Sequence, residues 1–188
     1  MKLGAALAAP STENRNILSL EELLDAIDRC ENATCFLQVS NKLINLKLKE
    51  LLPRVFIQDA LVMEYAVTPL LKEDGPLVET DVVSKLMFAM GKISLETYAD
   101  IGLFEQMHDF AKQQSEKIPF DDDLVYDFIS NQSVLGKQDD NFYLQSINKL
   151  KFSSFDAFSK ERYESLVKSV LKLSCESLLE KVEREILG

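Results

Sequence analysis

The stretch from Asp81 to Asn131 constrains the fold most, because apolar segments with helical spacing alternate in it with polar breaks. An apolar segment comes first, and after a short polar break a second amphipathic segment runs to about Lys117. A turn with Pro119 follows, and the next segment carries Leu124, Tyr126, Phe128 and Ile129. Apolar residues three and four apart line one face of a helix. The stretch is therefore typical of a helical hairpin that leads into the next one.

The composition favours the same class of fold for the whole chain. Among 188 residues only 6 are Gly and 5 are Pro, while Leu, Lys and Glu are common. Such a chain has good helix propensity and few interruptions. We expect an all-α fold of about seven to eight helices, stacked as hairpins in one repeat-like domain over residues 18–188. Residues 1–17 are expected to form a flexible N-terminal segment.

Local signals place individual helix ends. Ser19 is followed three residues later by Glu22, which is the pattern of a capping box and predicts a helix start. Gly91 is expected to end the helix that begins near Asp81. A helix ending near Leu71 carries apolar residues on all sides, which predicts burial on more than one face.

The charge and hydropathy limit the classes of partner. The 21 basic and 31 acidic side chains give a formal net charge of −10. Because affinity for a phosphate backbone rests on Lys and Arg, this charge argues against nucleic-acid binding as the main function. No apolar run approaches the roughly 20 residues of a membrane-spanning helix, so no membrane insertion is expected.

The residues that usually carry chemistry are not arranged as a site in the sequence. Cys30, Cys35 and Cys175 are odd in number and lack CxxC spacing, so we expect buried reduced thiols. The single His108 has no Cys or second His within one turn, which argues against a zinc site. Neither GxxxxGK[ST] nor GxGxxG occurs, and no nucleophile accompanies the clustered carboxylates. We predict no catalytic, cofactor-binding or metal-binding residues, and hence no enzyme.

Aromatic and acidic residues gather around two turns, near residues 120 and 142. An aromatic patch with a charged rim is typical of a protein interface, although each ring alone also suits packing between hairpins. The carboxylates before residue 124 equally suit a helix start, where the dipole favours negative charge. The predicted partner-binding residues are Phe120, Asp121, Asp122, Asp123, Tyr126, Phe142 and Tyr143.

One part of the chain resembles a pentatricopeptide repeat. The residues Leu103–Met107 (LFEQM) match the second-helix pattern of that family, Ile118–Asp121 (IPFD) match its link, and Val125–Ile129 open the next unit. The match covers about one repeat. In that family a polar residue early in the first helix reads an RNA base, and Asp127 stands at this position here. The resemblance therefore implies a helical-hairpin scaffold whose partner is a protein.

In size, helical content and acidic character, the chain is also similar to the pentatricopeptide-like small extra subunits of the euglenozoan (trypanosome) mitochondrial F1-ATPase. This resemblance implies a non-catalytic structural subunit that docks on the outer surface of the ATP synthase F1 sector. Its partner would be the F1 alpha subunit, within a large hetero-oligomer on the matrix side of the mitochondrial inner membrane. Two alternatives stay open: an organellar RNA-binding helical-repeat protein and another helical adaptor.

Overall fold

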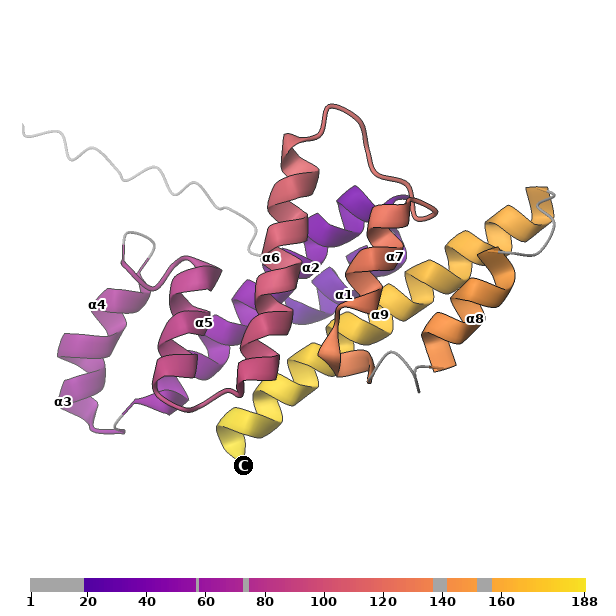
Figure 1. The fold of residues 1–188 in the computed structure, drawn as a ribbon. Helices are drawn as coiled ribbons and strands as arrows, with labels where there is room; N and C mark the ends of the chain where they lie inside the picture. Colours follow the sequence, from indigo (N-terminus) through magenta and orange to yellow (C-terminus); the bar gives the residue numbers. More distant parts are fainter. Residues whose placement is uncertain (1–18, 57, 73–74, 137–141, 152–156) are drawn as a thin grey trace, which may run out of the picture.

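The computed structural model describes residues 19–56, 58–72, 75–136, 142–151 and 157–188, and these form an all-helical fold (Figure 1). Its α-helices are α1 (Leu20–Asp28), α2 (Ala33–Leu51), α3 (Ala60–Val62), α4 (Thr68–Leu71), α5 (Thr80–Ala89), α6 (Leu95–Gln113), α7 (Asp123–Ser130), α8 (Phe142–Lys151) and α9 (Ala157–Leu187). Two short 3-10 turns, η1 (Leu52–Val55) and η3 (Ser133–Leu135), and one π turn, η2 (Met63–Val67), lie between them.

The helices α3 and α4 are joined through η2 without a break, so the three form one helix. Counted in this way, the described residues contain eight helices and no strand, which confirms the predicted all-α class and the number of helices. The segment 1–17, predicted to be flexible, lies outside the described residues, and the single domain over 18–188 stays a prediction. Among the described helices, none is long and apolar enough to cross a membrane.

Capping residues fix the helix ends where the sequence places them. The Ser19 hydroxyl accepts a hydrogen bond from the Glu22 N–H at 3.2 Å, and the Glu22 carboxylate accepts one from the Ser19 N–H at 2.7 Å. This confirms the predicted capping box. The Asn32 side chain caps α2 in a similar way. Gly91 follows α5 with φ of +66°, a left-handed conformation that glycine adopts without a steric cost, as predicted for this helix end.

The core is built around α2, which contacts α1, α5, α6 and α9. Its side chains Phe36, Leu43, Ile44 and Leu48 are at most 1% exposed. Neighbouring helices pack in pairs, α1 with α2, α5 with α6, and α8 with α9, but α2 also contacts α9, which lies far away in sequence. The hairpins therefore surround one central helix and do not form a linear stack.

The long helix α9 connects the parts of the molecule. It runs past α6, α7 and α8 in Figure 1 and contacts all three, as well as α2. The Lys168 ammonium donates hydrogen bonds to the carbonyl oxygens of Asp28 and Cys30, both at 2.7 Å, at the end of α1. Near the C-terminal end of α9, the Glu185 carboxylate accepts hydrogen bonds from the Ser94 N–H and hydroxyl, each at 2.9 Å. The helix thus holds α1 and α6 in place.

The helix that ends near Leu71 is not buried on several faces, and this prediction is wrong. Leu61 is 65% exposed and Tyr65 is 73% exposed, whereas Val67 is buried. Figure 1 shows the reason: α3 and α4 lie at one end of the molecule, beyond α5. The apolar pattern predicted a helix correctly, but burial of that helix also requires neighbouring helices. At this end of the molecule the neighbouring helices cover little of its surface.

Candidate functional site

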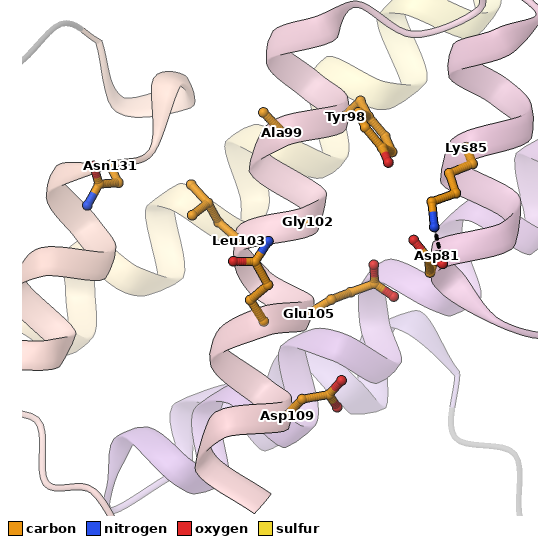
Figure 2. A pocket seen from close by; sticks show the side chains of 10 residues that line it. Asp81, Lys85, Tyr98, Ala99, Gly102, Leu103, Glu105, Asp109 and Asn131 are labelled. Carbon is orange, nitrogen blue, oxygen red and sulfur yellow. Dashed lines mark hydrogen bonds and ion pairs between the residues drawn. The ribbon is translucent and has the colours of Figure 1, made fainter.

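An open groove lies along α5 and α6 and reaches the end of α7 (Figure 2). Its volume is about 680 Å³. The lining residues are Asp81, Lys85, Tyr98, Ala99, Gly102, Leu103, Glu105, Gln106, Asp109 and Asn131. We refer to this feature as the α5–α6 groove. The sequence analysis did not identify it, because it depends on how the two helices face each other.

Small side chains on α6 help to open the groove. Ala99 and Gly102 lie three residues apart and therefore share one face of the helix. A β-carbon placed on Gly102 would meet no atom within 4 Å, so the backbone there borders open space. Above this face, the Tyr98 ring stacks on Phe88 of α5, with the ring centroids 5.0 Å apart and an interplanar angle of 6°. The aromatic stack fixes α5 relative to α6 and so sets the shape of the groove.

The groove is acidic. The Lys85 ammonium on α5 pairs with the Asp81 carboxylate at 2.6 Å, one helical turn away. Figure 2 shows Glu105 pointing from α6 toward this pair, with Asp109 one turn further along α6. The lining thus has three carboxylates and one lysine that is already paired. The surplus of negative charge favours a cationic group and repels an anion.

The surroundings of Glu105 in the groove change the pKa of its carboxyl. The pKa of its carboxyl is raised from the ordinary 4.5 to about 7, first because the side chain is partly buried and then because the charges of Asp81 and Asp109 disfavour ionisation. The Lys85 ammonium and the Asp81 backbone act in the opposite direction and lower this pKa, with a smaller effect. Glu105 therefore changes its charge close to neutral pH, and the negative charge of the groove depends on pH.

The histidine of the chain, His108, lies on α6 as well. His108 is half-buried on α6 and its Nδ1 lies 3.2 Å from an Asp109 oxygen. Burial, and then Lys112, lower the pKa of His108. Within the described residues no group of three or more His, Cys, Asp or Glu side chains is arranged to hold a metal ion.

The predicted partner-binding residues near the start of α7 have mostly structural surroundings. Phe120 is buried, with 5% of its surface exposed. The Asp121 carboxylate pairs with Lys160 of α9 at 2.8 Å, and Asp122 caps α7 by accepting the Leu124 N–H at 2.9 Å. Asp123 is the first residue of α7 and is exposed. Asp122 and Asp123 thus begin a helix, the other role that the sequence allowed them, while Asp121 connects this turn to α9.

The predicted residues at the second turn lie at the surface. Phe142 and Tyr143 begin α8, are 72% and 37% exposed, and have ring centroids 6.1 Å apart. The Tyr126 hydroxyl of α7 accepts a hydrogen bond from the Asn148 side chain of α8 at 2.9 Å, which connects the two groups of residues. None of the seven predicted residues lines the α5–α6 groove. Their role in binding a partner stays a prediction.

The sequence carried weak signals of the groove. Asp81 and Lys85 are four residues apart, a spacing that pairs opposite charges on a helix. Glu105 and Asp109 have the same spacing but equal charge, an arrangement that costs stability in a helix. Read together with the small residues at 99 and 102, these pairs mark α5 and α6 as unusual.

The model of the family described as "MtlR: Mannitol repressor" matches residues 19–183 of this chain. The chain belongs to the mannitol repressor family. It is 31% identical to Fumarase E from Escherichia coli (strain K12) over 166 residues. This aligned segment covers 88% of this chain and 97% of that protein. It is 25% identical over 160 residues to the Mannitol operon repressor of the same strain, covering 85% and 80%.

Two solved structures share the fold. A possible transcriptional regulator, YggD from Shigella flexneri, superposes with a TM-score of 0.77 and 29% identity, over 88% of this chain and 99% of that one. The MtlR of the Escherichia coli MtlR–HPr complex superposes with a TM-score of 0.70 and 23% identity, over 87% and 97%. The arrangement of helices around α2 is thus shared with both of these structures.

These findings correct the interpretation drawn from resemblance. The chain is not a pentatricopeptide-like subunit of the euglenozoan F1-ATPase, because the mannitol repressor family accounts for 165 residues (19–183) whereas the pentatricopeptide motifs covered about one repeat. The function as an ATP synthase subunit, the F1 alpha partner and the mitochondrial location are wrong as well, since the relatives come from bacteria and one is solved with HPr. The alternative of an organellar RNA-binding protein is wrong for the same reason as the mitochondrial location.

The physical reason for the error is that amphipathic helical hairpins share one binary pattern whatever their family. LFEQM in α6 has apolar residues at helical spacing, with Phe104 in the core, and needs no repeat to explain it. Asp127 is consequently not a base-reading position, and the argument against nucleic acid that rested on it no longer holds. The argument from net charge is independent of the resemblance.

Proposed function

We propose that this protein is a transcriptional regulator that acts by binding another protein and has no catalytic activity of its own. The observation that carries the proposal is the α5–α6 groove, which is open and has three carboxylates against one paired lysine. Family membership supports the regulatory role, since the family is described as that of the mannitol repressor and a related fold as a possible transcriptional regulator.

The proposed partner is an HPr-like protein that presents a lysine or arginine to the groove. The choice of partner rests on the Escherichia coli relative, which was solved as a complex with HPr. The choice of surface rests on charge, because complementary potentials steer association and exclude wrong partners. The apolar lining from Leu103 and the Tyr98 ring suits the aliphatic stem of such a side chain.

Regulation through a protein partner also fits the charge of the chain. With a net charge of −10, binding to DNA through phosphate contacts alone is unfavourable. We therefore propose that transcription is affected through the protein partner. Retention of operator DNA by the purified chain alone, with an affinity that falls steeply as salt rises, would contradict this point.

The binding experiment uses titration calorimetry with purified HPr of the same organism. The variants Glu105→Lys and Asp109→Lys reverse charges in the groove, and Glu161→Lys reverses an exposed charge on α9 outside it. We expect the wild type and Glu161→Lys to bind equally, and the groove variants to bind at least about tenfold more weakly. No binding by the wild type would refute the HPr-like partner, and equal binding by all variants would refute the groove as its site.

A second candidate function is hydration of fumarate, which is favoured by the 31% identity to Fumarase E. The groove does not favour it, because fumarate is a dianion and the lining carboxylates repel it. The two candidates are separated by following fumarate absorbance with the purified protein. Turnover that Glu105→Gln and Asp109→Asn abolish, while Glu161→Gln leaves it intact, would overturn the proposal that the protein is not an enzyme.

A further inference from the structure

The thiols of Cys30 and Cys35 meet across the turn between α1 and α2. Their sulfur atoms are 2.7 Å apart, although both cysteines are free. Cys30 follows the end of α1, and Cys35 lies in the first turn of α2. A disulfide bond is about 2.05 Å long, so a small movement would join them. The sequence analysis treated them as unrelated buried thiols, because their spacing matches no redox motif and only the turn brings them together.

The turn that carries the two thiols is held on several sides. The Asn32 side chain caps α2 by accepting the Cys35 N–H at 2.9 Å. The Lys168 ammonium of α9 donates to the Cys30 carbonyl oxygen at 2.7 Å. The Ala33 N–H donates to the Ile118 carbonyl oxygen at 2.9 Å, in the segment before α7. The thiols are therefore kept together by contacts from three parts of the chain, and their approach is a property of the fold.

The two thiols differ in their access to solvent. Cys30 is 2% exposed, and Cys35 is only partly buried. Burial, and then the contact with Cys35, raise the pKa of Cys30 to about 12, so this thiol keeps its proton at neutral pH. An oxidant in solution consequently reaches Cys35 first, and Cys30 is placed to react with the product.

We propose that Cys30 and Cys35 form a site of reversible oxidation, at which a peroxide converts the two thiols into an intramolecular disulfide. In the first step the Cys35 thiol loses its proton, its sulfur attacks hydrogen peroxide and the O–O bond breaks. Cys35 becomes a sulfenic acid, and the leaving hydroxide takes up the released proton to give water. In the second step the Cys30 sulfur gives up its proton and attacks the Cys35 sulfur. The S–O bond breaks, the S–S bond forms and a second water leaves, so one peroxide removes two electrons and two protons from the thiols.

Mass spectrometry of the folded protein after brief exposure to hydrogen peroxide tests this site. Trypsin cleaves after Arg29 and Lys42, so one peptide carries both thiols, while Cys175 lies in a separate peptide and is fully buried. We expect the peptide 30–42 to lose about 2 Da, the mass of two hydrogen atoms, and to regain it with dithiothreitol. The Cys175 peptide, treated in the same sample, is expected to stay reduced.

Two variants separate the steps. In Cys30→Ser the sulfenic acid on Cys35 has no neighbouring thiol, so it is expected to persist and to be trapped by dimedone. In Cys35→Ser neither the loss of mass nor trapping at Cys30 is expected, because Cys30 is buried. Addition of oxygen to the wild-type peptide without the loss of two hydrogens would overturn the proposal, as would oxidation of Cys175 at the same rate. Both readouts are independent of HPr binding.

Discussion

Replacement of Glu105 by glutamine is expected to stabilise the protein, and by an amount that depends on pH. The pKa of Glu105 is raised from 4.5 to about 7, and each difference of one in pKa between the folded and unfolded states corresponds to about 1.4 kcal/mol. A difference of about 2.5 gives roughly 3.4 kcal/mol as an upper limit. Because the side chain is only partly buried, solvent screens its charge, and we expect about 1–1.5 kcal/mol.

The sign of the change in stability with pH follows from whether the folded or the unfolded state binds the proton. Between pH 4.5 and about 7 the folded protein keeps a proton on Glu105 that the unfolded chain has released. The free energy of unfolding of the wild type therefore falls as the pH rises through this window, and the full cost is reached above it. Glutamine has no charge to desolvate, so Glu105→Gln removes the cost. The gain in stability should be small at pH 4.5 and complete at pH 8.

The assay is urea unfolding followed by far-UV circular dichroism, since the chain has no Trp to report by fluorescence. Wild type and Glu105→Gln are compared at pH 4.5 and pH 8, with Glu161→Gln as a control in an exposed carboxylate on α9. The control should change little at either pH. An equal gain for Glu105→Gln at both pH values, or a loss at pH 8, would refute the reasoning that burial and neighbouring carboxylates disfavour the Glu105 charge.

Other substitutions test the packing and the polar contacts. Glu185→Ala removes hydrogen bonds from Ser94 and Thr97 and should cost about 1–2 kcal/mol at pH 7. Burial raises the pKa of Glu185, but these hydrogen bonds outweigh it and the net pKa is lowered, so the cost should vanish in urea titrations as the pH falls below 4.5. Phe104→Ala, at a side chain that is 1% exposed, should cost about 3–5 kcal/mol in the same assay, and a cost below about 1 kcal/mol would place it outside the core. The buried Gln132 amide has no hydrogen-bond partner among the described residues, so Gln132→Met should raise the melting temperature, and a lower one would mean that the amide is satisfied.

The parts of the fold that depend on residues close together in the sequence were predictable from the sequence. The capping box at Ser19 and Glu22 works through atoms three residues apart, and Gly91 ends its helix by a local backbone preference. The periodicity of apolar residues likewise gave the class and the number of helices. In each of these cases the physical cause lies within one or two helical turns, so a single sequence contains it.

What the sequence did not predict depends on which helices meet. Leu61 and Tyr65 look like core residues, yet α3 and α4 lie beyond α5 and remain exposed. Glu105 differs from an ordinary surface glutamate because helix packing partly buries it and α5 places Asp81 near it. Cys30 and Cys35 have no motif spacing, and only the turn after α1 brings their sulfur atoms together. Site chemistry in this protein therefore arises from tertiary contacts, of which one sequence without relatives carries only weak signals such as the spacing of Glu105 and Asp109.

The contact between α9 and α1 has a consequence for how the protein folds as it is made. Lys168 and Lys172 bind Asp28 across 140 and 144 residues of sequence, and α2 also packs against α9. Translation proceeds from the N-terminus, so α1 and α2 leave the ribosome long before the helix that covers them has been synthesised. The apolar face of α2 is then open to other chains, and a chaperone that shields it until α9 emerges would raise the yield of folded protein.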